Sequence, residues 1–202
     1  MRVCPEMVAN YGWKTLLFGC FAFSSIIGIA ANAASTPKLD RAWKRYFNSQ
    51  WGYCVSYPAR WRKGDAFNGS GIFVETGVRK ESSPLGEIDI TALPDGPTDA
   101  RLSFADTIKV HLEGLKKFER AEHVELLEQR SIDLLGSSAL FAKEQYYDAL
   151  EHSKWVGEIV LAERQNALYR LELECRADQL TRFEPVFAHF VSTFQFDCPG
   201  KR

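Results

Sequence analysis

Histidine and carboxylate residues are the first candidates for chemistry in this sequence. The four histidines, none of them in an HExxH motif, are His111, His123, His152 and His189. In an extended segment His123 and Glu125 would share one face and could touch a metal ion, whereas His111 and Glu113 on a helix would point apart. A zinc site needs three or four converging ligands. Because only two are suggested here, we expect no metal ligand and no cofactor.

Hydrolytic chemistry would need a histidine beside a carboxylate, together with a nucleophile. The pairs of this kind in the sequence are His123 with Glu125 and His152 with Glu151. A serine nucleophile is expected on a strained turn that leads into a helix. The serine-containing segments 68–71 and 136–138 instead have the composition of ordinary β-turns. A hydrolase that uses a histidine with a carboxylate is therefore the alternative hypothesis.

Three cysteines, Cys54, Cys175 and Cys198, follow residue 33, and no Cys-x-x-Cys motif is present. In an oxidising compartment this odd number indicates one disulfide and one free thiol. We predict the bond Cys175–Cys198: a helix returning from Cys175, followed by a closing strand over 193–196 parallel to the first, would bring Cys198 beside Cys175. Cys54 with Cys198 is the alternative if the opening strand neighbours the closing one. Cys54 with Cys175, or three reduced thiols, also stay open.

Aromatic residues are concentrated on the predicted strands. Tyrosine and tryptophan contribute disproportionately to recognition sites, so part of this set could line a binding surface. The other interpretation is that these side chains fill the core and pair across strands. The candidates for an aromatic binding surface are Trp51, Tyr53, Trp61 and Trp155.

An antiparallel sheet and two helices would have to position these residues. Residues 168–175 alternate between apolar and charged, which is typical of a half-buried antiparallel strand. Helical spacing covers 103–119, with Ser103 as cap, and about 178–192, where Pro185 should kink the helix or mark its first turn. Further strands are predicted at 51–57, 72–76, 87–93, 123–130, 139–147, 154–162 and 193–196, with 45–48 either a strand or part of an early helix. The pattern predicts an α+β domain with a single antiparallel β-sheet covered by amphipathic helices.

The N-terminus has the pattern of a secretory signal. Positive residues precede an apolar stretch over 15–31, and Ala31-Asn32-Ala33 is a small-residue cleavage motif. We expect cleavage before Ala34, which gives a periplasmic or secreted protein with no stable membrane span. The alternatives are an uncleaved membrane anchor and lipidation at Cys20. The apolar stretch of about 17 residues is of marginal length for an anchor that spans the membrane.

The predicted organisation has three parts: a cleavable signal peptide over 1–33, a lead segment over 34–44 and one domain over 45–198. The 202-residue chain has a formal net charge of −1 and no long run of one sign. A nucleic-acid-binding protein would show a basic stripe, so no nucleic-acid partner is expected.

Four stretches of the sequence have the residue order of motifs found in a known fold family. They are Trp51–Pro58 followed by Trp61, Leu135–Ala139, Leu168–Leu171 and Phe190–Phe196. Together they resemble the PsbP-like fold family, which includes photosystem II PsbP and exported domains of the DcrB and LpqN type. The resemblance spans about residues 45–197 and implies an α/β/α sandwich. It also implies a binding or adaptor role, since such proteins are mostly not enzymes.

The sequence therefore favours an exported, non-enzymatic binding or adaptor module of the periplasm or cell envelope. Its partner is expected to be an envelope protein or a small ligand that the residues do not identify.

Overall fold

The computed structural model describes residues 43–66, 69–76, 85–94, 102–117 and 121–198. All of them belong to the second of two compact units, Lys38–Arg202. The predicted signal peptide over 1–33, Cys20, the cleavage point before Ala34 and all but the last two residues of the lead segment lie outside the described residues.

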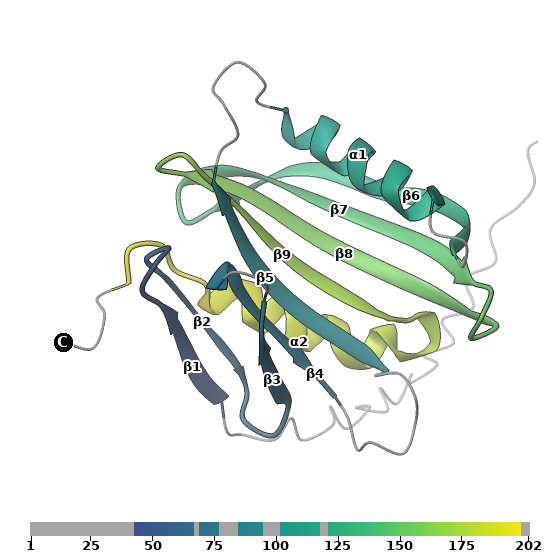
Figure 1. Cartoon of the computed structure of the whole chain (residues 1–202), viewed down its shortest axis with the longest axis horizontal. Coiled ribbons are helices and arrows are strands. Elements are labelled where there is room, and N and C mark those ends of the chain that lie inside the picture. The colour runs from purple at the N-terminus through teal and green to yellow at the C-terminus, as the bar shows by residue number, and fades with distance from the viewer. Residues whose placement is uncertain (1–42, 67–68, 77–84, 95–101, 118–120, 199–202) are drawn as a thin grey trace, which may run out of the picture. The chain divides into compact units, whose positions relative to one another are not determined.

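The strands form two antiparallel sheets, which corrects the prediction of a single sheet (Figure 1). The strands β1 (Trp43–Asn48) and β2 (Tyr53–Pro58) make a two-stranded sheet. The chain turns at Pro58, whose nitrogen has no hydrogen to donate, and the next strand begins in the other sheet.

The second sheet has seven strands in the order β3-β4-β5-β9-β8-β7-β6. Strand β3 was not predicted, because its four residues have no apolar alternation. Long hairpins connect β6 to β9, so these four strands are neighbours in sequence and in space. The bounds are β3 Arg62–Asp65, β4 Gly71–Glu75, β5 Gly86–Pro94, β6 Ala121–Leu134, β7 Ser137–Asp148, β8 Ser153–Arg164 and β9 Ala167–Arg176.

Two helices accompany the sheets, α1 (Phe104–Lys117) and α2 (Leu180–Thr193), and a short 3-10 turn precedes α2. The predicted cap of α1 is present: the Asp106 amide donates to Ser103 Oγ at 3.1 Å. Pro185 lies inside α2. Neither helix, nor any other in the described part of the chain, is long and apolar enough to cross a membrane.

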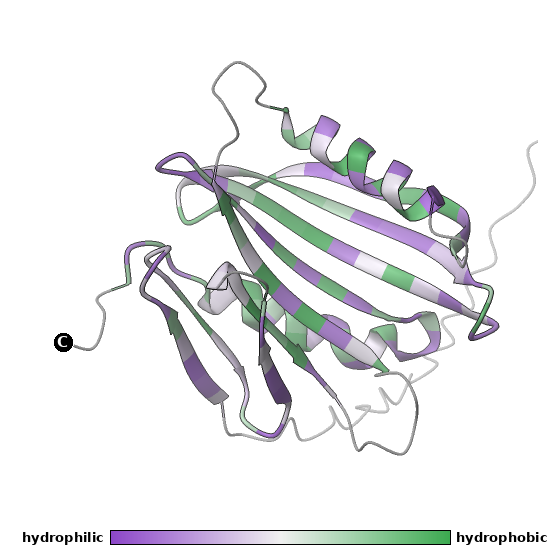
Figure 2. Cartoon of the chain, viewed as in Figure 1, coloured by the Kyte–Doolittle hydropathy of each residue, from purple (hydrophilic) through white to green (hydrophobic). Residues whose placement is uncertain are grey.

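Apolar and polar residues alternate along strands such as β5 and β9, visible as bands in Figure 2. The two faces of the sheet carry separate apolar clusters. The larger cluster lies where the seven-stranded sheet and β2 pack against α2, and it includes Phe183, Phe187 and Phe190 of the helix. The smaller cluster surrounds Ile108 of α1 on strands β7 and β8. The two helices thus pack on residues of opposite parity, and therefore on opposite faces of the sheet.

Candidate functional site

Acidic side chains collect on the face of the sheet that also carries α1. In the register of β5 with β9, Asp89 lies opposite Glu172 and Glu87 lies opposite Glu174. Like charges directly opposite one another in a sheet are destabilising. Two such pairs in succession on the same face therefore oppose the stability of the sheet.

A fifth carboxylate reaches this group from β7. Glu144 faces Gly157 of β8, and Gly157 faces Glu174 of β9, so the three residues form one row across the sheet. A Cβ atom on residue 157 would come within 2.9 Å of Glu144 Cγ, so glycine provides the space for this side chain. We call the set Glu87, Asp89, Glu144, Glu172 and Glu174 the carboxylate cluster.

Glu144 is the most buried acid of the cluster. Its side chain is only 4% exposed, and Oε1 lies 2.8 Å from Nε2 of His111 on α1. Its second oxygen, Oε2, is buried and has no hydrogen-bond partner. A buried carboxylate oxygen without a donor is costly, and each such case in a folded protein requires an explanation.

The ring of His111 bridges the helix and the sheet. Nη2 of Arg170 lies 3.0 Å from Nδ1 of His111. A guanidinium can only donate, so Nδ1 accepts and Nε2 carries the proton that is donated to Glu144. Both ring nitrogens are therefore occupied.

Arg170 is the main counter-charge of the cluster. Its Nη2 also lies 2.6 Å from Glu172 Oε2. Burial by itself would lower the pKa of the guanidinium. The neighbouring carboxylates outweigh it and raise the pKa above its usual value, and Glu172 has a larger effect than Asp89 or Glu144. Arg62 also acts on Glu87, but it lowers the pKa of that carboxyl by less than burial and the neighbouring acids raise it.

Electrostatic strain is evident in the acids of β5. Burial, reinforced by repulsion from Glu172, raises the pKa of Asp89 well above its usual range. Burial and the neighbouring Glu174 also raise the pKa of Glu87. Glu174 accepts a hydrogen bond from the Tyr146 hydroxyl. Strongly perturbed acids beside a histidine are typical of functional sites.

Three of these side chains have the arrangement of metal ligands. One donor atom from each of His111, Glu144 and Glu172 lies within 4.8 Å of the others. The sequence did not suggest this set, since its members come from α1, β7 and β9. The charged alternation of β5 and β9 is visible in the sequence, but the pairing of these strands is not.

The sequence-predicted aromatic surface is largely interior. Tyr53 is fully buried and Trp155 is 7% exposed. Trp61 and Trp51 are half-buried and pack against the larger core, Trp61 edge-on against Phe183. The burial of Tyr53 and Trp155 removes these two residues from the predicted aromatic surface, whereas Trp51 and Trp61 lie outside the strands and stay partly exposed.

The two histidine–carboxylate pairs considered for hydrolysis lie at exposed positions. No hydrogen bond joins His123 to Glu125 or His152 to Glu151 in the described chain. Glu125 instead accepts from Gln145 Nε2 at 2.7 Å, and Nδ1 of His152 lies 3.5 Å from the Tyr147 hydroxyl. His123 has a positive φ at a register shift of β6, and Glu151 and His152 lie in the turn between β7 and β8, so neither pair has the extended geometry that would place its side chains together.

The disulfide joins Cys54 to Cys198, and Cys175 is a buried free thiol. The predicted pairing of Cys175 with Cys198 is therefore wrong, and the alternative with Cys54 is present. The prediction assumed a closing strand beside β9, but α2 continues to Thr193 and Gln195 then bridges antiparallel to Cys54. Because of this pairing, Cys198 lies next to Cys54 of β2.

The chain is similar to several solved structures. The solution structure of cyanobacterial PsbP (CyanoP) from Synechocystis sp. PCC 6803 superposes with a TM-score of 0.58 at 14% identity, covering 88% of this chain and 99% of that one. LpqN of Mycobacterium tuberculosis, described as involved in cell envelope biogenesis, gives a TM-score of 0.48 at 14% identity, covering 76% and 90%. The protein PA94 of Pseudomonas aeruginosa, a putative regulator, gives 0.47 at 16% identity, covering 79% and 97%.

No family model and no curated protein sequence matches the chain. The likeness to cyanobacterial PsbP establishes the PsbP-like α+β fold and, at this identity, the fold alone.

Proposed function

From a PsbP-like fold that carries a strained acidic cluster, we propose that this protein is an exported, non-enzymatic binding module of the periplasm or cell envelope. Its ligand site is the carboxylate cluster, and the ligand that this site takes is a divalent metal ion. The observation that carries the proposal is the buried, unpartnered Oε2 of Glu144, beside His111 and Glu172.

The charge balance favours a divalent cation. Five carboxylates face Arg170 and a histidine whose hydrogen bonds are those of the neutral ring. Imidazole nitrogen together with carboxylate oxygen is a ligand set suited to Zn²⁺ or Mn²⁺. A bound ion would partner Glu144 Oε2 and relieve the repulsion that raises the pKa of Asp89 and Glu87.

Arg170 competes with the metal ion. Coordination through Nε2 of His111 requires the ring proton to move to Nδ1, which the guanidinium now faces. Arg170 must then turn away and keep only its carboxylate contact to Glu172. Arg170 is therefore the cation that compensates the site before the metal ion binds.

Export is supported by two features. The N-terminal segment has the pattern of a cleavable signal. The bond between Cys54 and Cys198 fits an oxidising compartment, where disulfides persist.

The competing hydrolase hypothesis would need a histidine that contacts both a carboxylate and a serine or cysteine nucleophile. His111 contacts the carboxylate of Glu144, but its other ring nitrogen faces Arg170, which is not a nucleophile. A general base must be within reach of the proton that it abstracts. The geometry therefore favours binding over catalysis.

The test is calorimetric titration of the purified, chelator-treated protein with Zn²⁺, Mn²⁺, Ca²⁺ and Mg²⁺. We expect saturable binding of Zn²⁺ or Mn²⁺ with one ion per chain. Loss of a residue that only hydrogen-bonds a metal ligand typically weakens metal binding 10- to 100-fold, so Glu144→Gln should weaken it by about tenfold or more. Glu122→Gln, which removes an exposed carboxylate of β6 outside the cluster, is the matched control.

A second variant separates ligand binding from structure. Arg170→Met removes the cation that competes with the metal ion. Without metal, the variant should unfold at a lower temperature than the wild type. On addition of metal, its unfolding midpoint should rise by more than that of the wild type. Absence of saturable binding to all four ions, or equal binding by wild type and Glu144→Gln, would refute the metal site.

A further inference from the structure

We propose that the Cys54–Cys198 disulfide is a thiol–disulfide exchange site whose reaction partner is a dithiol, with attack at Cys198 and departure of Cys54 as a thiolate stabilised by Arg45. This inference is independent of the metal site.

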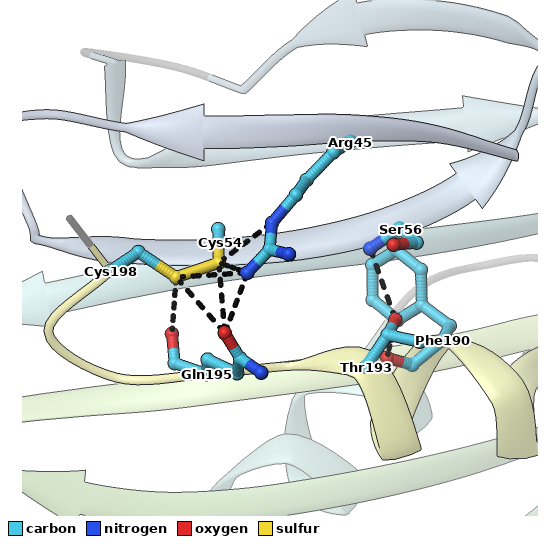
Figure 3. The surroundings of a disulfide bond; sticks show 7 residues. All are labelled: Arg45, Cys54, Ser56, Phe190, Thr193, Gln195 and Cys198. Carbon is cyan, nitrogen blue, oxygen red and sulfur yellow. Dashed lines mark hydrogen bonds between the residues drawn. A yellow bond between two sulfur atoms is a disulfide. The ribbon is translucent and has the colours of Figure 1, made fainter. Parts of the chain in front are cut away.

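Arg45 of β1 donates to Gln195 Oε1 at 2.6 Å and lies beside the disulfide, closer to the sulfur of Cys54 than to that of Cys198 (Figure 3). Its Nη2 and Nε donate to Cys54 Sγ at 2.8 and 3.3 Å, whereas Nη2 lies 3.6 Å from Cys198 Sγ. A disulfide sulfur is a weak acceptor, but a thiolate is a strong one. The guanidinium therefore stabilises the reduced state more than the oxidised state, and it does so chiefly at Cys54.

The two sulfurs also differ in access. Both residues are buried, but Cys198 at 9% exposed is more accessible than Cys54 at 1%, which favours attack at Cys198. Exchange is faster when the departing thiol has a low pKa, and a neighbouring cation lowers it. Accessibility and stabilisation of the leaving thiolate therefore both favour attack at Cys198 with departure of Cys54.

The electrons balance in two steps. A thiolate of the dithiol forms a bond to Cys198 Sγ, the disulfide breaks, and its electron pair goes to Cys54 Sγ beside Arg45. The second thiolate of the dithiol then attacks its own sulfur in the mixed disulfide and releases Cys198 as a thiolate, which takes up a proton. The dithiol is oxidised to a disulfide and releases two protons, and the protein gains two electrons: one proton goes to Cys198, which becomes a thiol, and the other goes to solvent while Cys54 stays a thiolate beside Arg45.

The backbone keeps the cysteines together after reduction. Cys54 and Gln195 exchange two backbone hydrogen bonds at 3.0 and 2.9 Å, and the Cys198 amide donates to the Gly52 carbonyl at 2.9 Å. These bonds do not depend on the disulfide, so re-oxidation restores the same pair. The third cysteine does not interfere, because burial raises the pKa of Cys175 to about 12.

The experiment measures the rate at which dithiothreitol reduces the native full-length protein. Arg45→Gln should slow reduction by about three- to tenfold, because the leaving thiolate loses its counter-charge. Arg45→Lys should restore part of the rate. Lys44→Gln, which removes a positive charge from the neighbouring residue of the same strand, should leave the rate unchanged.

Two further readouts distinguish this role from a structural one. Thiolate absorbance in the reduced protein should give a lower pKa for Cys54 in wild type than in Arg45→Gln. Glutathione followed by acid quench and peptide mapping should trap the mixed disulfide at Cys198. If Arg45 only stabilised the fold, its loss would loosen the site and speed reduction. An equal or faster rate in Arg45→Gln, or a mixed disulfide at Cys54, would overturn the proposal.

Discussion

Asp89 shows at the scale of a single residue how the site opposes the stability of the fold. It lies opposite Glu172 in the sheet, and its pKa is raised by burial and by that neighbour. An acid whose pKa is higher in the folded than in the unfolded state binds its proton more tightly when folded. Its favourable contribution is complete below the unfolded pKa and is lost as the pH rises through the folded pKa.

We therefore expect Asp89→Asn to stabilise the metal-free protein at neutral pH. Removal of one like-charge cross-strand pair should raise the free energy of unfolding by about 0.2–1 kcal/mol. The gain should shrink as the pH falls toward the usual range of aspartate, where wild-type Asp89 is protonated. Urea unfolding with chelator at several pH values measures this, and a gain independent of pH would contradict the assignment.

At the scale of the elements, the site depends on how close strand and helix side chains come. Gly157 of β8 leaves the space in which Glu144 of β7 reaches His111 of α1. The β6–β7 hairpin that fixes this register turns through Leu135 and Gly136, both with positive φ, as a two-residue hairpin turn requires. Gly136 was recognised in the sequence as a turn residue, but Gly157 was not singled out.

Gly157→Ala should displace Glu144 and weaken metal binding, because the new methyl group would meet Glu144 Cγ at 2.9 Å. The matched control is Gly114→Ala on α1, where an added Cβ meets nothing within 4 Å. That change should raise the free energy of unfolding by about 0.5–1 kcal/mol through helix propensity. Denaturant unfolding and metal titration of both variants test the pair. Unchanged metal affinity in Gly157→Ala would show that the glycine does not set the position of Glu144.

At the scale of the whole molecule, the C-terminal segment after α2 joins the two sheets. Gln195 pairs with Cys54 of β2, while α2 packs against both β2 and β9. The disulfide between Cys54 and Cys198 links positions separated by 144 residues. A closed loop of this length restricts the unfolded chain strongly, so the bond also stabilises the domain.

The exported form should begin near Ala34. Intact-mass measurement of protein recovered from the envelope or the medium decides this, and the expected mass is that of the chain from Ala34 with one disulfide. A mass that retains residues 15–33, or a lipid adduct on Cys20, would show that the segment is an anchor instead.

Local signals were sufficient for most elements. The alternation over 168–175 predicted β9, and Ser103 with helical spacing predicted α1, because both patterns report which face of a single element is buried. The early strand over 45–48, one of two interpretations, is present within β1. The PsbP-like fold suggested by the motifs is confirmed by the likeness to cyanobacterial PsbP.

The sequence alone determined the periodicity of most elements and several of their caps and turns, since these follow from interactions between near neighbours in the chain, while the PsbP-like fold was indicated by the resemblance of four motifs to that family. Only the tertiary structure decided which strands are adjacent. The partner of Cys198, the burial of Tyr53 and the meeting of His111, Glu144 and Glu172 all depend on that adjacency. Register between distant strands is set by the packing of the whole core, so no local pattern of residues records it.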